Sequence, residues 1–412
     1  MCFGVDQHNT YEQNDYPYRM ARRVSNTRGG RILLILIIVA VDILTSNVFL
    51  HTSSKLFRLF SSFTKRSIEM GYISKDIDKQ TRTNLIILSH SRSGSSFLGQ
   101  IFNHHPDVFY MYEPFYIMKV TTLDQSNFYE SSALRLLDDI LNCNFKNQEE
   151  YMGFLNHLPH HRYSSRSLTV PFCAPNQTDT KFGKTVRYFC KPLDPWETSR
   201  VCSTHKHRVI KLLTHRIPNF KVNFFKPLMK SEVNVKILQL VRDPRAIVAS
   251  MERVGWIQSY TQFNSKQTFI RTSFHDFEQR VKRFCFSLLD TIKFILEAER
   301  KLLGRYKLVR YEDLVQQITT KTDDVMKFAQ FRSSDDVTRW LQRSTHAENT
   351  AVRKKNYDYS TERVNISHLA DSWRRTLNRQ QIVVVEKYCK PVMTMLRYPV
   401  VFTDHVQKGF KP

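Results

Sequence analysis

Glycine and proline are scarce in this chain of 412 residues, which contains 11 glycines and 14 prolines. Their scarcity argues against a collagen-like or low-complexity protein, and a hydrophobic fraction of 41% is enough for a large core. The zinc-finger, RNP and basic-zipper signatures of nucleic-acid-binding proteins are also missing, as is the C-x-x-C spacing of metal ligands. We therefore expect one large globular domain or two ordinary ones, and no nucleic-acid partner.

Acidic residues are the minority charge, with 38 Asp and Glu against 62 Lys and Arg, and the formal net charge is +24. Such an excess attracts anionic partners, among them nucleotides, anionic membranes and acidic glycans. The basic residues are spread along the chain, and Arg353-Lys354-Lys355 is the one tight triplet. Charge alone does not choose among these partners.

Long hydrophobic runs are equally rare, and residues 32–50 (ILLILIIVAVDILTSNVFL) form the one strongly apolar segment. Roughly 20 apolar residues span a bilayer, although Asp42 within the segment costs about 3 kcal/mol. Five arginines precede the segment and favour a cytoplasmic N-terminus: Arg19, Arg22, Arg23, Arg28 and Arg31. We expect a transmembrane signal anchor, with a buried core helix as the alternative. The expected parts are a cytosolic tail (1–31), the anchor (32–50), a stem (51–82), a lumenal domain (83–402) and a C-terminal tail (403–412).

Two further features fit a lumenal domain. The sequons that begin at Asn176 and Asn365 are candidate N-glycosylation sites. Cys2 precedes the anchor, which leaves an even number of cysteines behind it: Cys143, Cys173, Cys190, Cys202, Cys285 and Cys389. Six cysteines permit disulfides with fifteen alternative pairings, among which the sequence does not choose.

From Thr83 onward, apolar runs alternate with amphipathic stretches. The predicted strands are residues 84–89, 209–213, 235–241 and 306–309. The predicted helices run from Ser96 to Phe102 and from Phe277 to Ile295, with Gly304 closing the second. Strands separated by helices indicate an α/β fold with a parallel sheet flanked by helices. Residues 143–206, rich in Cys, His and Pro, are predicted to be an irregular insertion that shapes the substrate site.

A loop of small residues follows the first predicted strand and precedes a helix. It consists of Ser91, Arg92, Ser93, Gly94, Ser95, Ser96 and Phe97. Small residues let backbone N–H groups approach a phosphate closely, and the helix N-terminus adds a favourable dipole. The loop has no Lys and only one Gly, so it does not match the ATP-binding signature G-x-x-x-x-G-K-[ST]. An ordinary strand-to-helix turn is the alternative interpretation.

A second candidate phosphate site follows the predicted strand 235–241. It consists of Arg242, Asp243, Pro244, Arg245, Ala246, Ile247, Val248, Ala249 and Ser250. Pro244 suits the first turn of a helix and Asp243 its N-cap, so Ser250 is predicted about two turns into the helix. Arg242 and Ser250 could then hold one phosphate from two sides. A capped helix with surface arginines is the alternative.

The two segments resemble a known family. Arg92 to Pro114 (RSGSSFLGQIFNHHPDVFYMYEP) is similar to the 5′-phosphosulfate-binding segment of the Golgi carbohydrate 6-O-sulfotransferases. Residues 242–250 are similar to the segment of these enzymes that binds the 3′-phosphate. The resemblance covers residues 83–400 and continues at 310–314 (RYEDL), Trp373-Arg374, Cys389 and Met393, but it is thin over 120–205. The chain departs from the family at Arg397-Tyr398, where Gly-Tyr is usual, and at Pro391, which is expected to interrupt the last helix.

This resemblance implies a P-loop-like sulfotransferase fold in a single-pass type II protein of the Golgi membrane. It implies that both segments bind the donor PAPS (3′-phosphoadenosine-5′-phosphosulfate), with Arg92 at the transferred group and no metal. The acceptor would be a sugar hydroxyl of a glycoprotein glycan or glycosaminoglycan, at C6 of galactose, N-acetylglucosamine or N-acetylgalactosamine. The acceptor sugar and the oligomeric state, including a homodimer, stay open.

Sulfuryl transfer needs a base for the attacking hydroxyl. We expect Glu113 to be that base, with His104 and His105 as alternatives, and we interpret Glu312 and Asp313 as structural. The histidines of the HLPHH segment (157–161) are expected in an exposed loop. Trp373, Arg374 and the 353–355 triplet are candidate contacts to adenosine or an anionic glycan. The competing functions are a catalytically inactive PAPS- or glycan-binding membrane protein, a secretory-pathway kinase and a tyrosine sulfotransferase.

Overall fold

The computed structural model describes most of the chain between Arg82 and Phe402. The described residues are 82–120, 128–180, 183–218, 220–230, 234–257, 262–263, 269–270, 273–345, 366 and 369–402. They all lie within one compact unit, Asp78–Pro412. Within these ranges no helix combines the length and apolarity that crossing a bilayer requires. The predicted tails, anchor and stem (apart from Arg82), the 353–355 triplet and Asn365 lie outside them.

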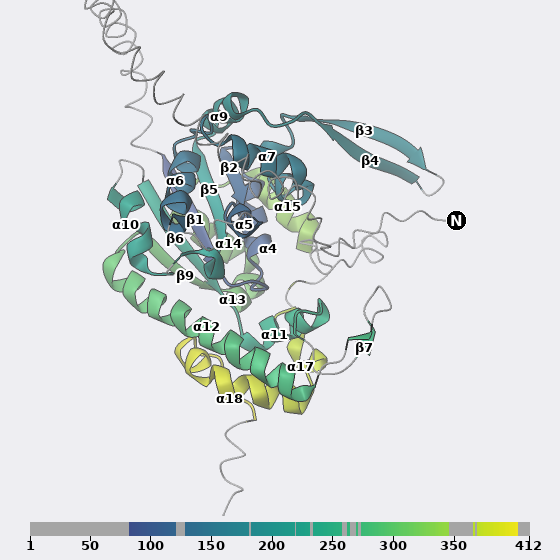
Figure 1. The fold of residues 1–412 in the computed structure, drawn as a ribbon, viewed down its shortest axis with the longest axis vertical. Helices are drawn as coiled ribbons and strands as arrows, with labels where there is room; N and C mark the ends of the chain where they lie inside the picture. Colours follow the sequence, from purple (N-terminus) through teal and green to yellow (C-terminus); the bar gives the residue numbers. More distant parts are fainter. Residues whose placement is uncertain are drawn as a thin grey trace, which may run out of the picture. The chain divides into compact units, whose positions relative to one another are not determined.

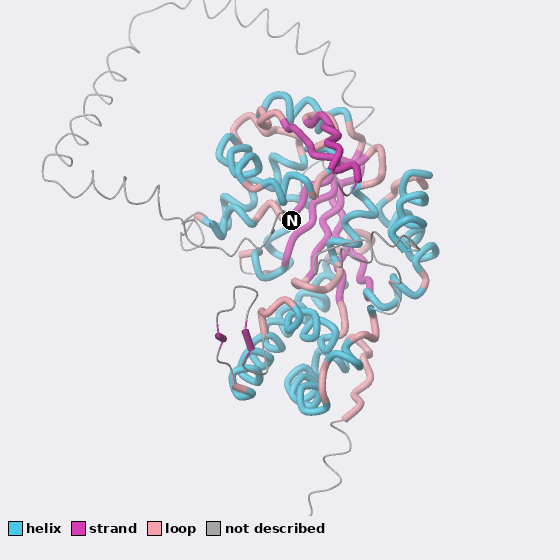
Figure 2. Tube along the Cα trace, turned by 90° about the vertical axis from the view of Figure 1, so that its right-hand side faces the viewer, coloured by secondary structure: helices cyan, strands magenta, loops and turns pink. Residues whose placement is uncertain are grey.

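A five-stranded sheet forms the centre of the compact unit (Figures 1 and 2). Its strands are β1 (Thr83–Ser89), β2 (Val108–Tyr112), β5 (His207–Leu213), β6 (Asn234–Val241) and β9 (Tyr306–Arg310). They pair in the order β2-β5-β1-β6-β9, and each of these pairings is parallel. Continuous apolar runs are typical of strands covered on both faces. The predicted parallel sheet is therefore confirmed, with β2 as a strand that the sequence analysis missed.

Helices cover both faces of the sheet because alternate side chains of each strand point to opposite sides. In β1, Leu85 and Ile87 enter one core, and Ile86 and Leu88 enter the other. The first core is closed by α4 (Ser95–Asn103), α14 (Ile318–Ala329) and α15 (Asp335–Thr345). The second is closed by α6 (Tyr129–Leu141), α10 (Val222–Lys230) and the C-terminal part of α12 (Phe274–Lys301).

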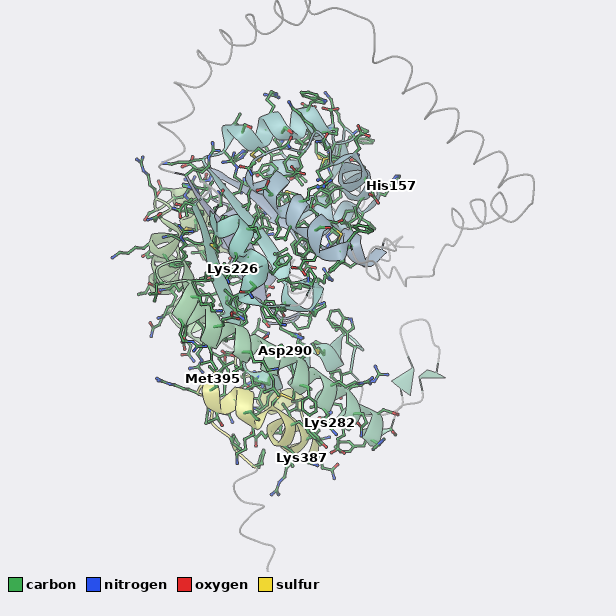
Figure 3. All side chains as sticks on the ribbon, turned by 60° about the vertical axis from the view of Figure 1, so that its left-hand side comes forward. His157, Lys226, Lys282, Asp290, Lys387 and Met395 are labelled. Atoms are coloured by element: carbon green, nitrogen blue, oxygen red, sulfur yellow. A yellow bond between two sulfur atoms is a disulfide. The ribbon has the colours of Figure 1, made fainter. Side chains whose placement is uncertain are left out.

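A third apolar cluster joins α12 to α11 (Pro244–Arg253), α17 (Trp373–Thr376) and α18 (Arg379–Met395). A capping box between Ser273 and Asp276 begins α12, and Gly304 lies in the turn after its end with a φ of 72°. Figure 3 shows Lys282 of α12 and Lys387 of α18 where these two helices run side by side. The long helix predicted from its apolar spacing is thus confirmed.

The expected interruption at Pro391 is wrong, because α18 continues through this residue to Met395. Proline removes one backbone hydrogen bond inside a helix. The residues on either side are held by packing, since Val385, Val392 and Met393 are buried in the third cluster. Tertiary packing therefore offsets the local cost of the proline.

The prediction that residues 143–206 are irregular is also wrong. They contain α7 (Glu149–His157), α8 (Pro159–Tyr163), the 3₁₀ turn η2 (Arg166–Leu168), the hairpin of β3 (Cys173–Thr180) with β4 (Gly183–Cys190), and α9 (Pro195–Thr204). Two of the prolines read as loop residues stand in the first turns of α8 and α9, where a proline favours a helix. Asn176 lies in β3. The smaller elements elsewhere are α5 (Tyr116–Val120), η3 (Thr214–Arg216), β7 (Gln262–Phe263), β8 (Phe269–Ile270) and α13 (Tyr311–Gln316).

Three disulfides use the six cysteines that follow the predicted anchor. The pairs are Cys143–Cys202, Cys173–Cys190 and Cys285–Cys389. The first two tie down the 143–206 region, and the third connects α12 to α18. The predicted use of these cysteines in disulfides is confirmed, and the structure selects one of the fifteen pairings.

Candidate active site

The loop 91–97 lies between β1 and α4, at the carboxyl edge of the sheet. Arg92 and Gly94 both have left-handed backbone conformations, with φ of 66° and 89°. Alternation of this kind turns successive N–H groups toward one side and makes an anion-binding concavity. A Cβ on Gly94 would lie 2.3 Å from the ring of Tyr311, so the close approach of α13 requires glycine here.

The N-terminus of α4 supplies further donors for an anion. Gly94 is its N-cap and offers no side chain to the first-turn N–H groups. The carbonyl of Gly94 accepts hydrogen bonds from the N–H groups of Phe97 and Leu98, at 3.0 and 3.2 Å. No acidic residue stands in the first turn. The loop and the helix end therefore fit the phosphate-binding role predicted for this segment.

The second segment begins α11 as the sequence indicates. The Asp243 side chain accepts a hydrogen bond from the Arg245 N–H at 2.9 Å, and Pro244 occupies the first turn. Ser250 lies about two turns into the helix. Arg92 Nε donates to Ser250 Oγ at 3.0 Å, and Arg242 Nη1 donates to the Arg92 carbonyl oxygen at 3.1 Å. The fold thus joins two segments that are 158 residues apart in the sequence.

Other residues of the second segment point away from this junction. Arg245 is buried, forms ion pairs with Asp243 and Glu386 at 2.7 Å, and lies 4.0 Å above the ring of Trp373. Four apolar residues of α11 are buried in the third cluster: Ala246, Ile247, Val248 and Ala249. Arg245 therefore joins α11 to α17 and α18, and the buried Trp373 ring is not open to a ligand.

Glu312 supports the loop between β6 and α11. Its carboxylate accepts hydrogen bonds from the Asp243 N–H at 3.0 Å and from the Tyr398 hydroxyl at 2.7 Å. Burial raises the pKa of Glu312, and these two hydrogen bonds partly offset that effect. The structural interpretation of Glu312 agrees with these contacts. Tyr398 contributes to them even though its neighbour Arg397 departs from the family pattern.

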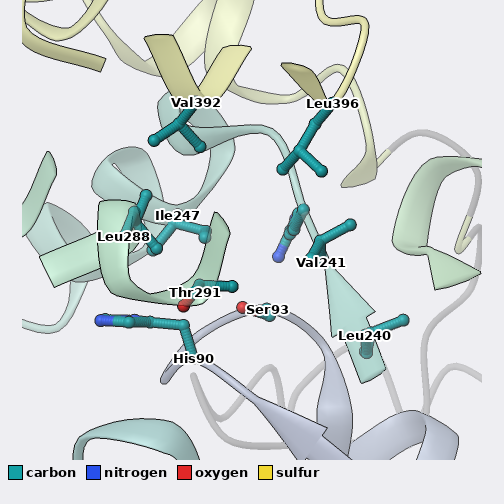
Figure 4. Close-up of a pocket in the computed structure, with 10 residues that line it drawn as sticks. His90, Ser93, Leu240, Val241, Ile247, Leu288, Thr291, Val392 and Leu396 are labelled. Atoms are coloured by element: carbon teal, nitrogen blue, oxygen red, sulfur yellow. The ribbon is translucent and has the colours of Figure 1, made fainter. Parts of the chain in front are cut away.

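A small cavity lies beside the loop 91–97 and is partly lined by Ser93 (Figure 4). It is lined mainly by apolar side chains of β6, α11, α12 and α18, with the hydroxyls of Ser93 and Thr291 among the few polar groups. Neither hydroxyl has a hydrogen-bond partner in the structure. Ser93 of the loop and Arg242 at the end of β6 both line this cavity, so it adjoins the two candidate segments.

Glu113 directly follows β2 and has a φ of 46°. Its buried carboxylate lies between two cations. One oxygen accepts a hydrogen bond from Lys211 Nζ and the other from Arg216 Nη1. Burial alone would raise the pKa of this carboxyl, but Lys211 and Arg216 outweigh burial and lower the pKa to about 2. Burial lowers the pKa of Lys211, and the charge of Glu113 opposes that shift. The carboxylate is therefore ionised at neutral pH.

Aromatic side chains surround this cluster. Lys211 Nζ lies 4.6 Å above the ring of Tyr112, and the Arg216 guanidinium lies 4.6 Å above the ring of Tyr116. The ring of His161 packs 4.6 Å from that of Tyr116. Burial lowers the pKa of His161 to about 4, an effect that the nearby Glu113 carboxylate opposes. The expected exposed loop of histidines is wrong, because His157 ends α7 and both His160 and His161 lie in α8. His157 and His160 are exposed, whereas His161 is buried.

The two histidines proposed as alternative bases lie elsewhere. His104 caps the C-terminal end of α4 and stacks on Trp340 at 4.8 Å. His105 Nε2 lies 3.0 Å from the carbonyl oxygen of Arg332. Both are separated from the start of α4 by the length of this helix, about 14 Å for nine residues. Among the candidate bases, Glu113 is the one at the carboxyl edge of the sheet.

Lys211 and Arg216 were missed as site residues by the sequence analysis. Lys211 interrupts the apolar run VIKLL of β5, and a lysine that is 2% exposed in a central strand needs a buried anion. That interruption was the available signal. Arg216 carried no comparable signal, because η3 follows the strand as an ordinary polar turn. In the described part of the chain, no group of three potential ligands stands where it could bind a metal ion.

Comparisons with known proteins agree with this architecture. Residues 82–397 match the sulfotransferase domain family. Carbohydrate sulfotransferase 1 of Danio rerio is 30% identical over 359 residues, which cover 82% of this chain and 83% of the relative. The human protein of that name is 30% identical, with 80% and 82% covered. Carbohydrate sulfotransferase 3 of Tetronarce californica is 27% identical, with 86% and 82% covered.

Solved structures are more distant. The sulfotransferase domain from the curacin biosynthetic pathway aligns with a TM-score of 0.42 at 15% identity, covering 77% of this chain and 98% of that domain. Retinol dehydratase in complex with androsterone and inactive cofactor PAP aligns with a TM-score of 0.39 at 17% identity, covering 75% of this chain and 80% of its own.

Proposed function

The chain belongs to the sulfotransferase domain family, among the carbohydrate sulfotransferases, and on that basis we propose that it transfers the sulfuryl group of PAPS to a sugar hydroxyl. The observation that supports this proposal is the hydrogen bond of Arg92 to Ser250, which joins the two candidate phosphate-binding segments in one place. Two anion sites side by side suit a donor that carries a 5′-phosphosulfate and a 3′-phosphate. ATP has no 3′-phosphate, so an ATP-dependent kinase would not need the second anion site.

We propose that residues 91–97 hold the 5′-phosphosulfate and that Arg242 and Ser250 hold the 3′-phosphate. The left-handed loop at Arg92 and Gly94 and the uncapped start of α4 support the first assignment. The half-buried Arg242 at the end of β6 supports the second, because its position adjoins both Ser250 and the loop. The other residues of the second segment position helix α11; they are Asp243, Pro244 and residues 245–249.

In the proposed mechanism, catalysis is mostly positioning and electrostatic stabilisation, as in phosphoryl transfer. Arg92 and the loop N–H groups oppose the charge that develops on the leaving phosphate. Glu113 is the proposed base for the attacking hydroxyl. Its pKa of about 2 makes it a weak base in this state. When an acceptor and a sulfuryl group draw Lys211 and Arg216 toward their oxygens, the carboxylate loses part of its charge neutralisation and becomes more basic.

The finer assignments are proposals of the same kind. We propose C6 of galactose, N-acetylglucosamine or N-acetylgalactosamine as the target, in glycoprotein glycans or glycosaminoglycans. The names of the curated relatives support a carbohydrate acceptor. A Golgi location, with residues 32–50 as the membrane anchor, is supported by the sequence pattern and by the three disulfides, which form in oxidising compartments.

The experiment that tests this function uses the full chain, purified in detergent, with radiolabelled PAPS and desulfated keratan, desulfated chondroitin and N-acetylglucosamine-terminated acceptors. We expect label transfer to at least one of them. Arg92→Ala should weaken PAP binding by about 10- to 100-fold, the worth of a charge-assisted contact. An exposed arginine of α9, Arg200, provides the matched control as Arg200→Ala. A wild-type chain that binds PAP but labels no acceptor on the panel would contradict the proposed transfer.

A further inference from the structure

Two of the four tryptophans are buried and two are exposed. Trp340 and Trp373 belong to apolar cores, whereas Trp196 is 63% exposed and Trp256 is 46% exposed. Trp196 contacts the ammonium of Lys146 on the far side of the 143–206 region. Trp256 instead lies at the candidate active site, because the guanidinium carbon of Arg92 is 5.8 Å from the centre of its ring.

The backbone holds Trp256 in place through the end of α11. Gly255 has a φ of 75° and donates its N–H to the Glu252 carbonyl at 3.0 Å, and the Trp256 N–H donates to the Met251 carbonyl at 2.9 Å. This pair of hydrogen bonds is the Schellman motif that commonly ends helices. A hydrophobic residue in the position of Trp256 usually packs back on the helix. Here nearly half of the side chain stays accessible beside Arg92.

The neighbours of Trp256 indicate which substrate it faces. Arg92 hydrogen bonds to Ser250 and follows β1, the strand that pairs directly with β5, which carries Lys211. Lys211 in turn binds Glu113. Trp256 therefore lies beside Arg92, and Arg92 shares the carboxyl edge of the sheet with Lys211 and the proposed base. A group that stacks on Trp256 therefore lies next to Arg92, which we place at the transferred group.

We propose that Trp256 is the surface on which the acceptor sugar ring stacks, and so a specificity-determining residue for the acceptor. This inference rests on the proposed function. One face of a pyranose ring exposes mainly C–H groups, which pack well on the negative face of an indole. The adenine of the donor is less suited, because the ribose separates it from the phosphosulfate that Arg92 holds.

The test compares Trp256→Ala, Trp256→Phe and the control Trp196→Ala in the full chain. Transfer from saturating PAPS to desulfated keratan and desulfated chondroitin oligosaccharides gives the acceptor KM, and calorimetry gives the PAP dissociation constant. Trp256→Ala should raise the acceptor KM by about 5- to 10-fold, the worth of one aromatic stacking contact. Trp256→Phe should restore most of this loss. In both variants the PAP dissociation constant should change by less than about two-fold, as in Trp196→Ala.

A second measurement needs no turnover. The dead-end complex with PAP is titrated with the same oligosaccharides while tryptophan fluorescence is recorded. The signal should change in the wild type and in Trp196→Ala, but not in Trp256→Phe. Weaker PAP binding by Trp256→Ala with an unchanged acceptor KM would assign the ring to adenine and overturn the proposal. So would an acceptor KM that neither variant alters. A wild type that transfers no sulfate at all would count against the proposed function instead.

Discussion

Glu113→Gln removes one negative charge from between two buried cations while keeping the shape of the side chain. The Glu113 side chain is 8% exposed and that of its partner Lys211 is 2% exposed. Water can therefore do little to replace the negative charge that the substitution removes. Arg216, at 13% exposure, is the second partner. The variant therefore leaves the Lys211 ammonium buried without its anion, which is costly in proteins.

The structure gives the size of this effect. The pKa of Glu113 is about 2, compared with an ordinary value of 4.5. Since each tenfold change in proton affinity corresponds to about 1.4 kcal/mol, the ionised carboxylate stabilises the folded protein by about 3 kcal/mol. Because the pKa is lower in the folded state, this stabilisation is complete above pH 4.5 and is lost as the pH falls toward 2. Glu113→Gln should therefore lower the free energy of unfolding by about 3 kcal/mol at pH 7.

The assay is urea unfolding of the full chain, followed by fluorescence, at pH 7 and again near pH 3. The difference between wild type and Glu113→Gln should shrink at the lower pH, where the wild-type carboxylate begins to protonate. Glu150→Gln, at an exposed position of α7, is the matched control and should change stability by less than about 0.5 kcal/mol. In Glu113→Gln/Lys211→Met, most of the lost stability should return because the ammonium is gone.

Activity separates the structural role of Glu113 from its proposed chemical role. If Glu113 is the base, Glu113→Gln should lower kcat by about 100-fold or more, and PAP binding should be unchanged. The double variant with Lys211→Met should stay inactive even though it is stable. A stability loss below about 0.5 kcal/mol in the single variant would refute the ion-pair argument. Full turnover with normal PAP binding would refute the assignment of the base.

Two further predictions concern the loop and the helix pair. Gly94→Ala places a Cβ against an aromatic ring at a positive φ, so PAP binding should be lost and the free energy of unfolding should fall by about 1–3 kcal/mol. Gly153→Ala is its control, because a Cβ there meets nothing within 4 Å inside α7, and it should stabilise the protein by about 0.5–1 kcal/mol. Replacing Cys285 and Cys389 together by Ser should cost about 2–5 kcal/mol in urea unfolding. An unchanged unfolding temperature in Gly94→Ala would contradict the close approach of Tyr311 to Gly94. An unchanged unfolding temperature in the double cysteine variant would contradict the stabilising role of the disulfide.

The sequence predicts the centre of the fold well because local patterns and tertiary structure agree there. Apolar runs flanked by polar turns locate β1, β5, β6 and β9, and Asp243-Pro244 locates the start of α11. The strand β2 was missed although VFYMY is a typical strand run. It was interpreted only as part of the longer resemblance, and its place beside β5 depends on a contact about 100 residues away along the chain.

The errors come from residues whose effect depends on distant packing. Pro391 disfavours a helix locally, but α12 and the Cys285–Cys389 disulfide hold the surrounding turns. The histidines of α8 were predicted to lie in a loop, because the residues around them show no helical spacing of apolar side chains. His161 is nevertheless buried against aromatic rings of β2 and α5. Neither contact can be inferred from spacing, since each joins segments that are far apart along the chain.

The order of the strands explains how an acidic base can share a site that binds anions. Parallel strands bring their carboxyl ends to one edge of the sheet. The strand order β2-β5-β1-β6 therefore places four charged residues along that edge, in the order Glu113, Lys211, Arg92 and Arg242. A lone carboxylate beside a phosphosulfate would repel it. Lys211 lies on β5, between the strand that ends beside Glu113 and the strand that leads to the proposed donor site, and its charge attracts both anions. Arg216 neutralises the other carboxylate oxygen. The buried lysine of β5 is thus the residue that makes the proposed base and the proposed donor site compatible.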